Sequence, residues 1–190
     1  MGEKEYIGAY RAWVYACVNA IAERVADMDL FLEQKKGDHW QKIDSHPAID
    51  LLINPNDFYS FYELVFAHEA MQQLNGNTFW FLNLNGGGNI AEIWPIDPTR
   101  MSIVKDKKYF ISGYVYQPEG GDAIPFKPEQ IIHLKRFNPQ DDRRGMGTVQ
   151  AADLSIDIFT YASEWQRNFF GNSAMPSGAL MTEGTLTDEQ

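Results

Sequence analysis

The pattern of apolar and polar residues divides the chain into helical stretches at both ends and a β-rich middle. Apolar residues recur every three or four positions in residues 10–28 and again in residues 60–76, which predicts two amphipathic helices. A short helix is expected in residues 46–54, because Pro55 disfavours helical backbone before it. Ser60 and Glu63 form a capping-box pattern, and Gly76 is placed to end the second long helix.

The middle of the chain reads as strands. Residues 30–34 and 40–43 flank a turn-like tetrad, and residues 77–85 and 89–96 flank three consecutive glycines, so each pair predicts a β-hairpin. Three more strand candidates are residues 100–104, 109–117 and 131–135. Helices together with hairpins predict an α+β fold, in which a mixed body is followed by one long helix.

A proline-rich corner follows the second hairpin. Pro95 and Pro98 restrict the backbone on both sides of Ile96 and Asp97, so the strand must end or bend there. A bulky ring at such a corner most often fills a core, and Trp94 is therefore expected to be buried and structural.

One long helix is expected from Thr148 to Phe170, with Gly171 ending it. Its apolar and polar residues fall on two separate stripes, one expected to pack and one to face solvent. The stripe expected to pack is Ala151, Leu154, Ile158, Ala162, Trp165 and Phe169. The acidic stripe is Asp153, Asp157 and Glu164. Residues 187–190 form another capping-box pattern, so a further helix is expected to begin there and the chain is expected to be part of a longer protein.

Composition narrows the function classes. The chain has 26 acidic and 16 basic residues among 190, for a net charge of −10, whereas a protein that grips nucleic acid through its phosphates needs a basic surface. A hydrophobic content of 44% is enough for a sizeable core. The single cysteine, Cys17, lies in an apolar helical pattern and is expected to be a buried structural thiol.

No arrangement of residues indicates catalysis or metal binding. His68 and Glu69 begin a zinc-protease pattern, but Gln72 stands where the second histidine is needed, and the four histidines lack ligand spacing. No nucleophile motif is present. Catalytic residues, metal and cofactor are therefore not expected, and the chain is not expected to be an enzyme.

The stretch RRGMGTVQAAD, residues 143–153, leaves two interpretations open. A strand, a glycine-containing loop and a helix in this order can bind a phosphate, so a nucleotide-binding enzyme using the Gly145–Thr148 loop is one alternative. No lysine follows the glycines, however, and the third glycine of a dinucleotide motif is absent. The structural alternative is that Gly145 and Gly147 allow a sharp turn and Thr148 caps the helix.

Six stretches, taken in order, resemble the portal proteins of tailed bacteriophages, which form the ring at one vertex of the capsid. They are residues 14–32, 46–56, 76–85, 92–104 with the sequence Trp-Pro-x-Asp-Pro, 131–152 and 164–180. One departure is visible: members of the family often have Ser-Pro after the glycine where this chain has Gly147 and Thr148.

The resemblance implies a domain organisation. Residues 1–145 would form the wing of a portal protein, residues 146–172 a stem helix, and residues 173–190 the start of the clip. The loop at Gly145 and Gly147 would then join wing to stem without binding a nucleotide. Trp94, Pro95 and Pro98 are expected to be structural, and Asp153, Asp157 and Glu164 could form an acidic face of the ring.

The resemblance also implies partners. The full-length protein would assemble into a dodecameric ring that contacts the capsid protein, the terminase packaging motor and the head–tail adaptor. Double-stranded DNA would pass through the channel without sequence-specific binding, and no membrane or cofactor would take part. The ring would belong to the virion of a phage or prophage, at a capsid vertex, after assembly in the cytoplasm of the host bacterium.

Overall fold

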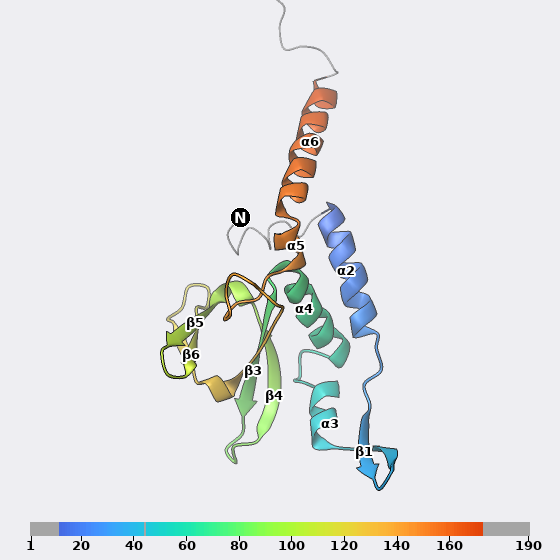
Figure 1. Cartoon of the computed structure of the whole chain (residues 1–190), viewed down its shortest axis with the longest axis vertical. Coiled ribbons are helices and arrows are strands. Elements are labelled where there is room, and N and C mark those ends of the chain that lie inside the picture. The colour runs from blue at the N-terminus through green and yellow to red at the C-terminus, as the bar shows by residue number, and fades with distance from the viewer. Residues whose placement is uncertain (1–11, 44, 173–190) are drawn as a thin grey trace, which may run out of the picture. The chain divides into compact units, whose positions relative to one another are not determined.

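The computed structural model describes residues 12–43 and 45–172. The chain forms two compact units, residues 1–151 and residues 152–190. The described part of the first unit combines four helices with eight strands, and that of the second unit contains one long helix (Figure 1). The α+β class predicted from the sequence is confirmed. The expected start of a clip-like region at residues 173–190 lies outside the described residues.

Three helices of the first unit correspond to helices predicted from the sequence. They are α2 (Ala12–Ala26), α3 (Pro47–Ile53) and α4 (Phe61–Leu74). Ser60 and Glu63 form the predicted capping box, in which the Ser60 hydroxyl accepts from the Glu63 amide and the Glu63 carboxylate accepts from the Ser60 amide. Gly76 follows α4 with a φ of +77°, a conformation that favours glycine.

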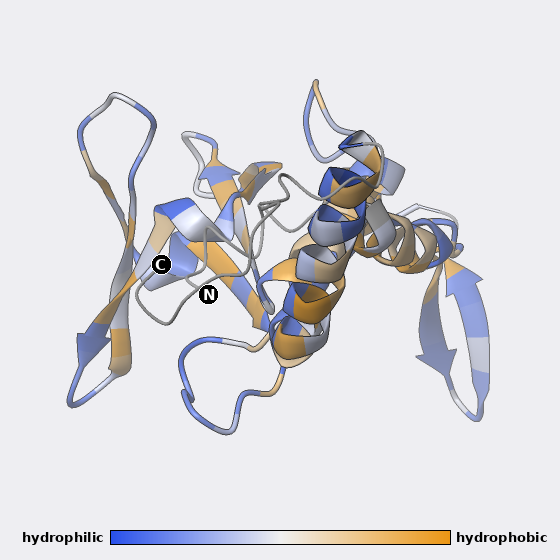
Figure 2. Cartoon of the chain, turned by 90° about the horizontal axis from the view of Figure 1, so that it is seen from above, coloured by the Kyte–Doolittle hydropathy of each residue, from blue (hydrophilic) through white to orange (hydrophobic). Residues whose placement is uncertain are grey.

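Within the described residues all strand pairs are antiparallel, and the strands form three sheets. The first is the hairpin of β1 (Leu32–Lys36) and β2 (His39–Ile43). The second has the order β4–β3–β8, made of Ile90–Ile96, Asn77–Leu84 and Ile131–Lys135. The third has the order β5–β6–β7, made of Met101–Asp106, Phe110–Tyr116 and Ile124–Phe126. Both predicted hairpins are confirmed, whereas β7 was missed because it has only three residues. The β1–β2 hairpin is largely hydrophilic (Figure 2).

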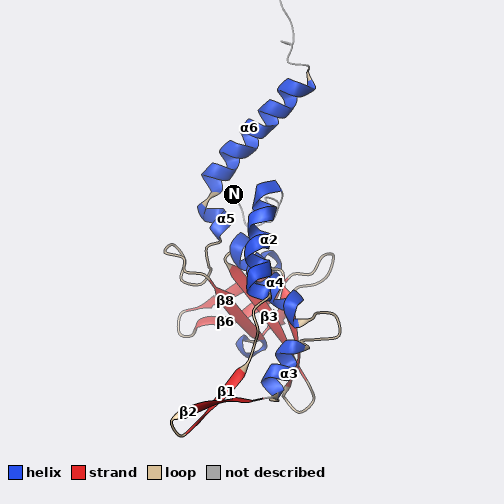
Figure 3. Cartoon of the chain, turned by 90° about the vertical axis from the view of Figure 1, so that its right-hand side faces the viewer, coloured by secondary structure: helices blue, strands red, loops and turns tan. Residues whose placement is uncertain are grey.

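The first unit is layered. Helix α2 packs on α4, and α4 packs on β3 and β4 through a core of Leu64, Leu82 and Ile93 (Figure 3). The other face of the β4–β3–β8 sheet packs on the β5–β6–β7 sheet through a second core of Phe79, Met101, Tyr114 and Ile131. Helix α2 and the β5–β6–β7 sheet are therefore the two outer layers of this unit (Figures 1 and 3).

The side of α2 that packs does not include Cys17, which was expected to be buried. Val18, Ala22 and Ala26 are buried, whereas Trp13 is 68% exposed and Cys17 is exposed as well. Small residues four apart let α2 approach α4 closely, because little side chain separates the two backbones. Periodicity detects an apolar stripe but cannot tell which of two stripes packs inside, so the prediction of a buried Cys17 was wrong.

The long C-terminal helix is interrupted. The structure has α5 (Thr148–Ala151) and α6 (Asp153–Gly171), separated by Ala152 at φ −95° and ψ 7°. The amide of Ala151 donates to the Gly147 carbonyl at 3.1 Å, so Thr148 is the first helical residue rather than the cap. Neither glycine nor proline marks this break, so the single uninterrupted helix was a wrong prediction without a sequence warning.

Trp94 is half-buried rather than buried. Its indole Nε1 donates to the Glu92 carboxylate at 3.0 Å, and its ring meets Tyr59 edge-on at 6.2 Å between centroids. Because side chains of a strand alternate between the two faces, Ile93 takes the buried position and Trp94 faces the other way. The burial predicted from the proline corner was therefore too strong.

We expect Phe79→Ala to destabilise the protein by about 3–5 kcal/mol, because the side chain is fully buried between two sheets. Trp94→Ala should cost less, about 1–2 kcal/mol, because that ring is already partly exposed. Urea unfolding of both variants checks this order. An equal or larger loss for Trp94→Ala would show that its ring carries more of the core than its burial indicates.

Candidate assembly interface

The loop after β8 touches the end of α4 backbone to backbone. A Cβ placed on Gly145 would lie 1.9 Å from the Gly76 carbonyl oxygen, and one on Gly147 would lie 2.5 Å from the Leu74 carbonyl oxygen. The Arg136 amide also donates to the Gly76 carbonyl at 2.9 Å. No side chain larger than hydrogen fits at Gly145 or Gly147 without moving the backbone of the α4 end.

Asn77 holds this contact from inside. Its side chain is 1% exposed; its Nδ2 donates to the carbonyls of Asn75 and Gly145 at 3.1 and 3.2 Å, and its Oδ1 accepts from the Gly145 amide at 2.7 Å. The Nε2 of His133 lies 3.1 Å from the same Oδ1. Since an amide oxygen only accepts, the hydrogen of His133 must sit on Nε2, which selects one neutral tautomer.

The fold keeps His133 neutral. Its ring stacks on Phe79 at 4.2 Å and meets Tyr114 edge-on at 5.9 Å. Burial, followed by the positive charges of Arg144 and Lys135, lowers the pKa of His133 from 6.5 to about 4. At neutral pH this residue is therefore a hydrogen-bond donor and an aromatic filler between the two sheets.

Further polar contacts join β8 to α4. The Arg136 guanidinium pairs with the Glu69 carboxylate at 2.8 Å, and the Gln72 side chain donates to the Leu134 carbonyl at 2.8 Å. We name the contacts of Gly145, Gly147 and Asn77 with the end of α4 the junction. The sequence does not point to Asn77 or Gln72, because a polar residue at the end of a helix or the start of a strand usually faces solvent. Only the pairing of β3 with the distant strand β8 reveals their roles.

The junction leaves little for a phosphate to bind. The Gly145 amide already donates to Asn77, and α5 has only four residues. The backbone of the α4 end covers Gly145 and Gly147. The geometry thus favours the structural alternative over a nucleotide site in the Gly145–Thr148 loop, since a phosphate loop needs free amides at the start of a stable helix.

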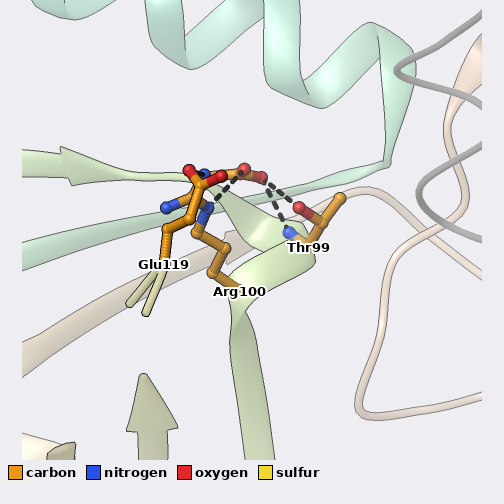
Figure 4. Close-up of polar contacts among 4 residues, drawn as sticks. Thr99, Arg100 and Glu119 are labelled. Atoms are coloured by element: carbon orange, nitrogen blue, oxygen red, sulfur yellow. Dashed lines mark hydrogen bonds and ion pairs between the residues drawn. The ribbon is translucent and has the colours of Figure 1, made fainter. Parts of the chain in front are cut away.

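The proline corner is built around Pro98, which is buried and opens a short 3₁₀ turn, Pro98–Arg100. Asp97 caps this turn by accepting from the Thr99 amide at 2.9 Å and its hydroxyl at 2.7 Å. Arg100 lies 3.5 Å from Asp97 and 2.9 Å from the exposed carboxylate of Glu119 (Figure 4). Pro95 lies in β4, an edge strand opposite Trp80, where its missing amide hydrogen is tolerated.

The apolar stripe of α6 is exposed in the part of the chain that the structure describes. None of the residues of α6 is buried, and Leu154 and Trp165 are 74% and 66% exposed. Asp153 and Asp157 are half-buried, whereas Glu164 is exposed. The two stripes are centred about 120° apart at 100° per residue, so they are neighbours on the helix rather than opposites. A line of large apolar side chains in water is typical of a surface that meets a partner.

Other chemistry is not apparent in the described part. Among residues 12–43 and 45–172, no group of three or more His, Cys, Asp or Glu side chains could hold a metal ion. None of the described helices has the length and apolar character that a bilayer crossing requires.

We expect Gly145→Ala to destabilise the protein by several kcal/mol, roughly 3 or more, because its Cβ would meet the Gly76 carbonyl oxygen. Gly86→Ala is the matched control, since a Cβ there has nothing within 4 Å. Thermal unfolding of both variants is the measurement. Similar melting temperatures for the two would contradict the close contact.

Stability should fall as the pH drops from about 6.5 to about 4, because the folded state holds the pKa of His133 below its usual value. A base whose pKa is lowered on folding stabilises the fold above its unfolded pKa and loses that contribution as acid protonates the unfolded chain. His133→Gln should flatten this fall, whereas the exposed His39→Gln should not. Burial also lowers the pKa of His68, so part of the slope should remain. An unchanged slope in His133→Gln would contradict this account.

Comparison with known proteins finds one family that matches almost the whole chain. A profile of the family described as phage portal protein matches residues 12–190. A protein of Rickettsia bellii is 32% identical over 97% of this chain and 49% of its own length. Two solved structures of gene transfer agent necks contain chains of similar fold. A chain of the neck of an empty particle, computed with C6 symmetry, superposes on this chain with a TM-score of 0.76. A chain of the neck of a native particle, computed with C12 symmetry, superposes with a TM-score of 0.72. They are 30% and 29% identical, and each match covers 92% of this chain and 48% or 47% of the other. The chain spans about half the length of the relatives it matches, and it belongs to the phage portal protein family.

Proposed function

We propose that this chain is a structural subunit of a portal ring through which DNA enters and leaves a capsid. The observation that carries the proposal, beside the family match, is the exposed apolar stripe of α6. Intrinsic helix propensity contributes little to the stability of a helix of 19 residues, and none of the residues of α6 is buried. Most of the stability of such a helix comes from packing of its apolar face against a partner. Neighbouring copies of the same helix in a ring would cover the stripe, as in other bundles of parallel helices.

The proposed ring has twelve subunits. The similar chain from the native particle belongs to a neck computed with C12 symmetry, which supports this number for relatives. A ring repeats one heterologous contact around its axis, so each subunit needs two different complementary surfaces. The role is structural, and we assign no catalytic residue or cofactor to it.

We assign three regions to this subunit. Residues 1–145 form the wing, residues 146–172 the stem-like part, and residues 173–190 the start of the clip. The junction, with Gly145 and Gly147, would fix the point at which the chain leaves the wing, while Trp94, Pro95 and Pro98 shape its corner. The boundary between the two compact units, after Ala151, lies six residues beyond the proposed end of the wing.

The acidic stripe would serve the passage of DNA. Asp153, Asp157 and Glu164 repeated around a ring would add a negative field that discourages phosphates from sticking. We place the ring in the virion at a capsid vertex, after assembly in the host cytoplasm. Its partners would be the capsid protein, the terminase packaging motor and the head–tail adaptor, with double-stranded DNA sliding through.

We expect Ile158→Asn combined with Trp165→Gln to prevent ring formation, because both side chains lie on the exposed apolar stripe. Phe159→Asn combined with Phe170→Gln removes two exposed apolar residues on another side of α6 and is the matched control. Sedimentation of the full-length protein measures the particle mass. We expect the mass of a ring for the control and the mass of a single subunit for the stripe variant. Ring-sized particles from the stripe variant would contradict the proposed role of α6.

Replacing Asp153 and Asp157 with Asn and Glu164 with Gln tests the acidic face. Rings should still form, because the apolar stripe is intact, but they should retain more DNA after packaging stops. DNA packaging yield and DNA retention are the measurements. If both equal those of the unmodified protein, the acidic stripe is an ordinary solvent-facing surface without a role in DNA passage.

A further inference from the structure

The two outer layers of the first unit present different surfaces. Helix α2 covers one side and the β5–β6–β7 sheet the other, with α4 and the β4–β3–β8 sheet between them (Figures 1 and 3). In a head-to-tail ring, one side of a subunit meets the opposite side of the next. The residues exposed on these two layers are therefore the candidates for the contact between neighbours.

A basic hollow lies at the turn between β5 and β6. It is shallow, with a volume of about 640 Å³, and is lined by Lys105, Asp106, Lys107, Lys108, Phe110 and Arg143. Asp141 borders the hollow, since the hydrogen bond from the Arg143 amide and then the charges of Lys105 and Arg143 lower its pKa. Of the six lining residues, however, four are basic and only Asp106 is acidic, although acids outnumber bases in the whole chain by 26 to 16. The acid is engaged in shaping the turn, because Asp106 accepts from the amides of Lys108 and Tyr109 at 2.6 and 2.8 Å. These hydrogen bonds lower the pKa of Asp106.

Aromatic rings extend the hollow into a partly apolar surface. The Arg143 guanidinium lies over the Phe110 ring at 4.2 Å, and its Nε donates to the Phe110 carbonyl at 3.2 Å. Lys108 lies over the Tyr109 ring at 4.9 Å. Tyr109 is 68% exposed. Rings and cations held together in this way suit a partner that offers both apolar and acidic groups.

The outward side of α2 offers both. Trp13, Cys17 and Ile21 lie within about 80° of one another on the helix, at 100° per residue, and all three are exposed. Towards and beyond the end of the helix, the exposed acids are Glu23, Asp27 and Asp29, against the single base Arg24. This surface is thus apolar along the helix and acidic at its end, the complement of the basic hollow.

We propose that the β5–β6 turn of one subunit docks on the outward side of α2 in the next subunit. Lys107 and Lys108 then face Asp27 and Asp29, and Tyr109 covers part of the apolar surface around Trp13 and Ile21. The inference rests on the proposed ring and names its contact between wings. A second copy fits better than DNA, because DNA would neutralise the basic hollow but leave the apolar side of α2 in water.

Exchanging the charges of the two surfaces in the full-length protein tests this contact. Lys107→Glu with Lys108→Glu, or Asp27→Lys with Asp29→Lys, should each raise the subunit concentration needed for ring assembly by about tenfold or more. The four substitutions together should bring that concentration back to within about threefold of the unmodified protein. Lys35→Glu with Lys36→Glu, which changes the same charge in the β1–β2 hairpin, should leave assembly unaltered.

A designed cross-link separates this inference from the proposed function. In a Cys17→Ser background, Lys108→Cys with Asp27→Cys should give ladders of disulfide-linked subunits when assembled rings are oxidised. Rings without ladders, or a swap that fails to restore assembly, would overturn the inference while leaving the portal role intact. No ring from the unmodified protein would contradict both. Binding of duplex DNA that is lost in Lys107→Glu with Lys108→Glu, while assembly is unaffected, would assign the hollow to DNA and overturn the inference.

Discussion

Where the loop after β8 returns to the end of α4, two backbones meet with no side chain between them. Gly145 lies against Gly76, and the buried amide of Asn77 bonds both the amide and the carbonyl of Gly145. A buried backbone group without a partner would cost about 1–3 kcal/mol, so this satisfied network resists sliding. The helical layer, the β4–β3–β8 sheet and the loop that leads to α5 are fixed by this contact. The second sheet adds to it through His133, whose ring packs between Phe79 and Tyr114.

Local structure followed from the sequence, and long-range structure did not. The capping box at Ser60 and both glycine-turn hairpins depend on neighbouring residues, so short patterns predict them. The pairing of β3 with β8 joins residues 50 to 58 positions apart, and neither strand carries a signal for the other. The roles of Asn77 and Gln72 depend on that pairing, which is why these two buried polar residues were not predicted.

Exposed apolar residues were harder to interpret than buried ones. Periodicity found an apolar stripe on α2, where Cys17 was expected to be buried, and another on α6, which was expected to pack. In the structure both stripes face solvent, with Trp13 and Trp165 at 68% and 66% exposure. A subunit of a ring buries apolar residues in two places, in its own core and in the interfaces with its neighbours. A single sequence contains both patterns without distinguishing them.

Hydrogen exchange at the Gly145 amide tests the junction most directly. This amide lies in a loop, yet it donates to a side chain that is 1% exposed, so it should exchange only when the first unit opens as a whole. Its protection should therefore match that of the β3 amides and exceed that of Gly86 at the hairpin tip by several orders of magnitude. Exchange of Gly145 as fast as that of Gly86 would show that the loop leaves α4 freely, and would contradict the account of how this fold is held together.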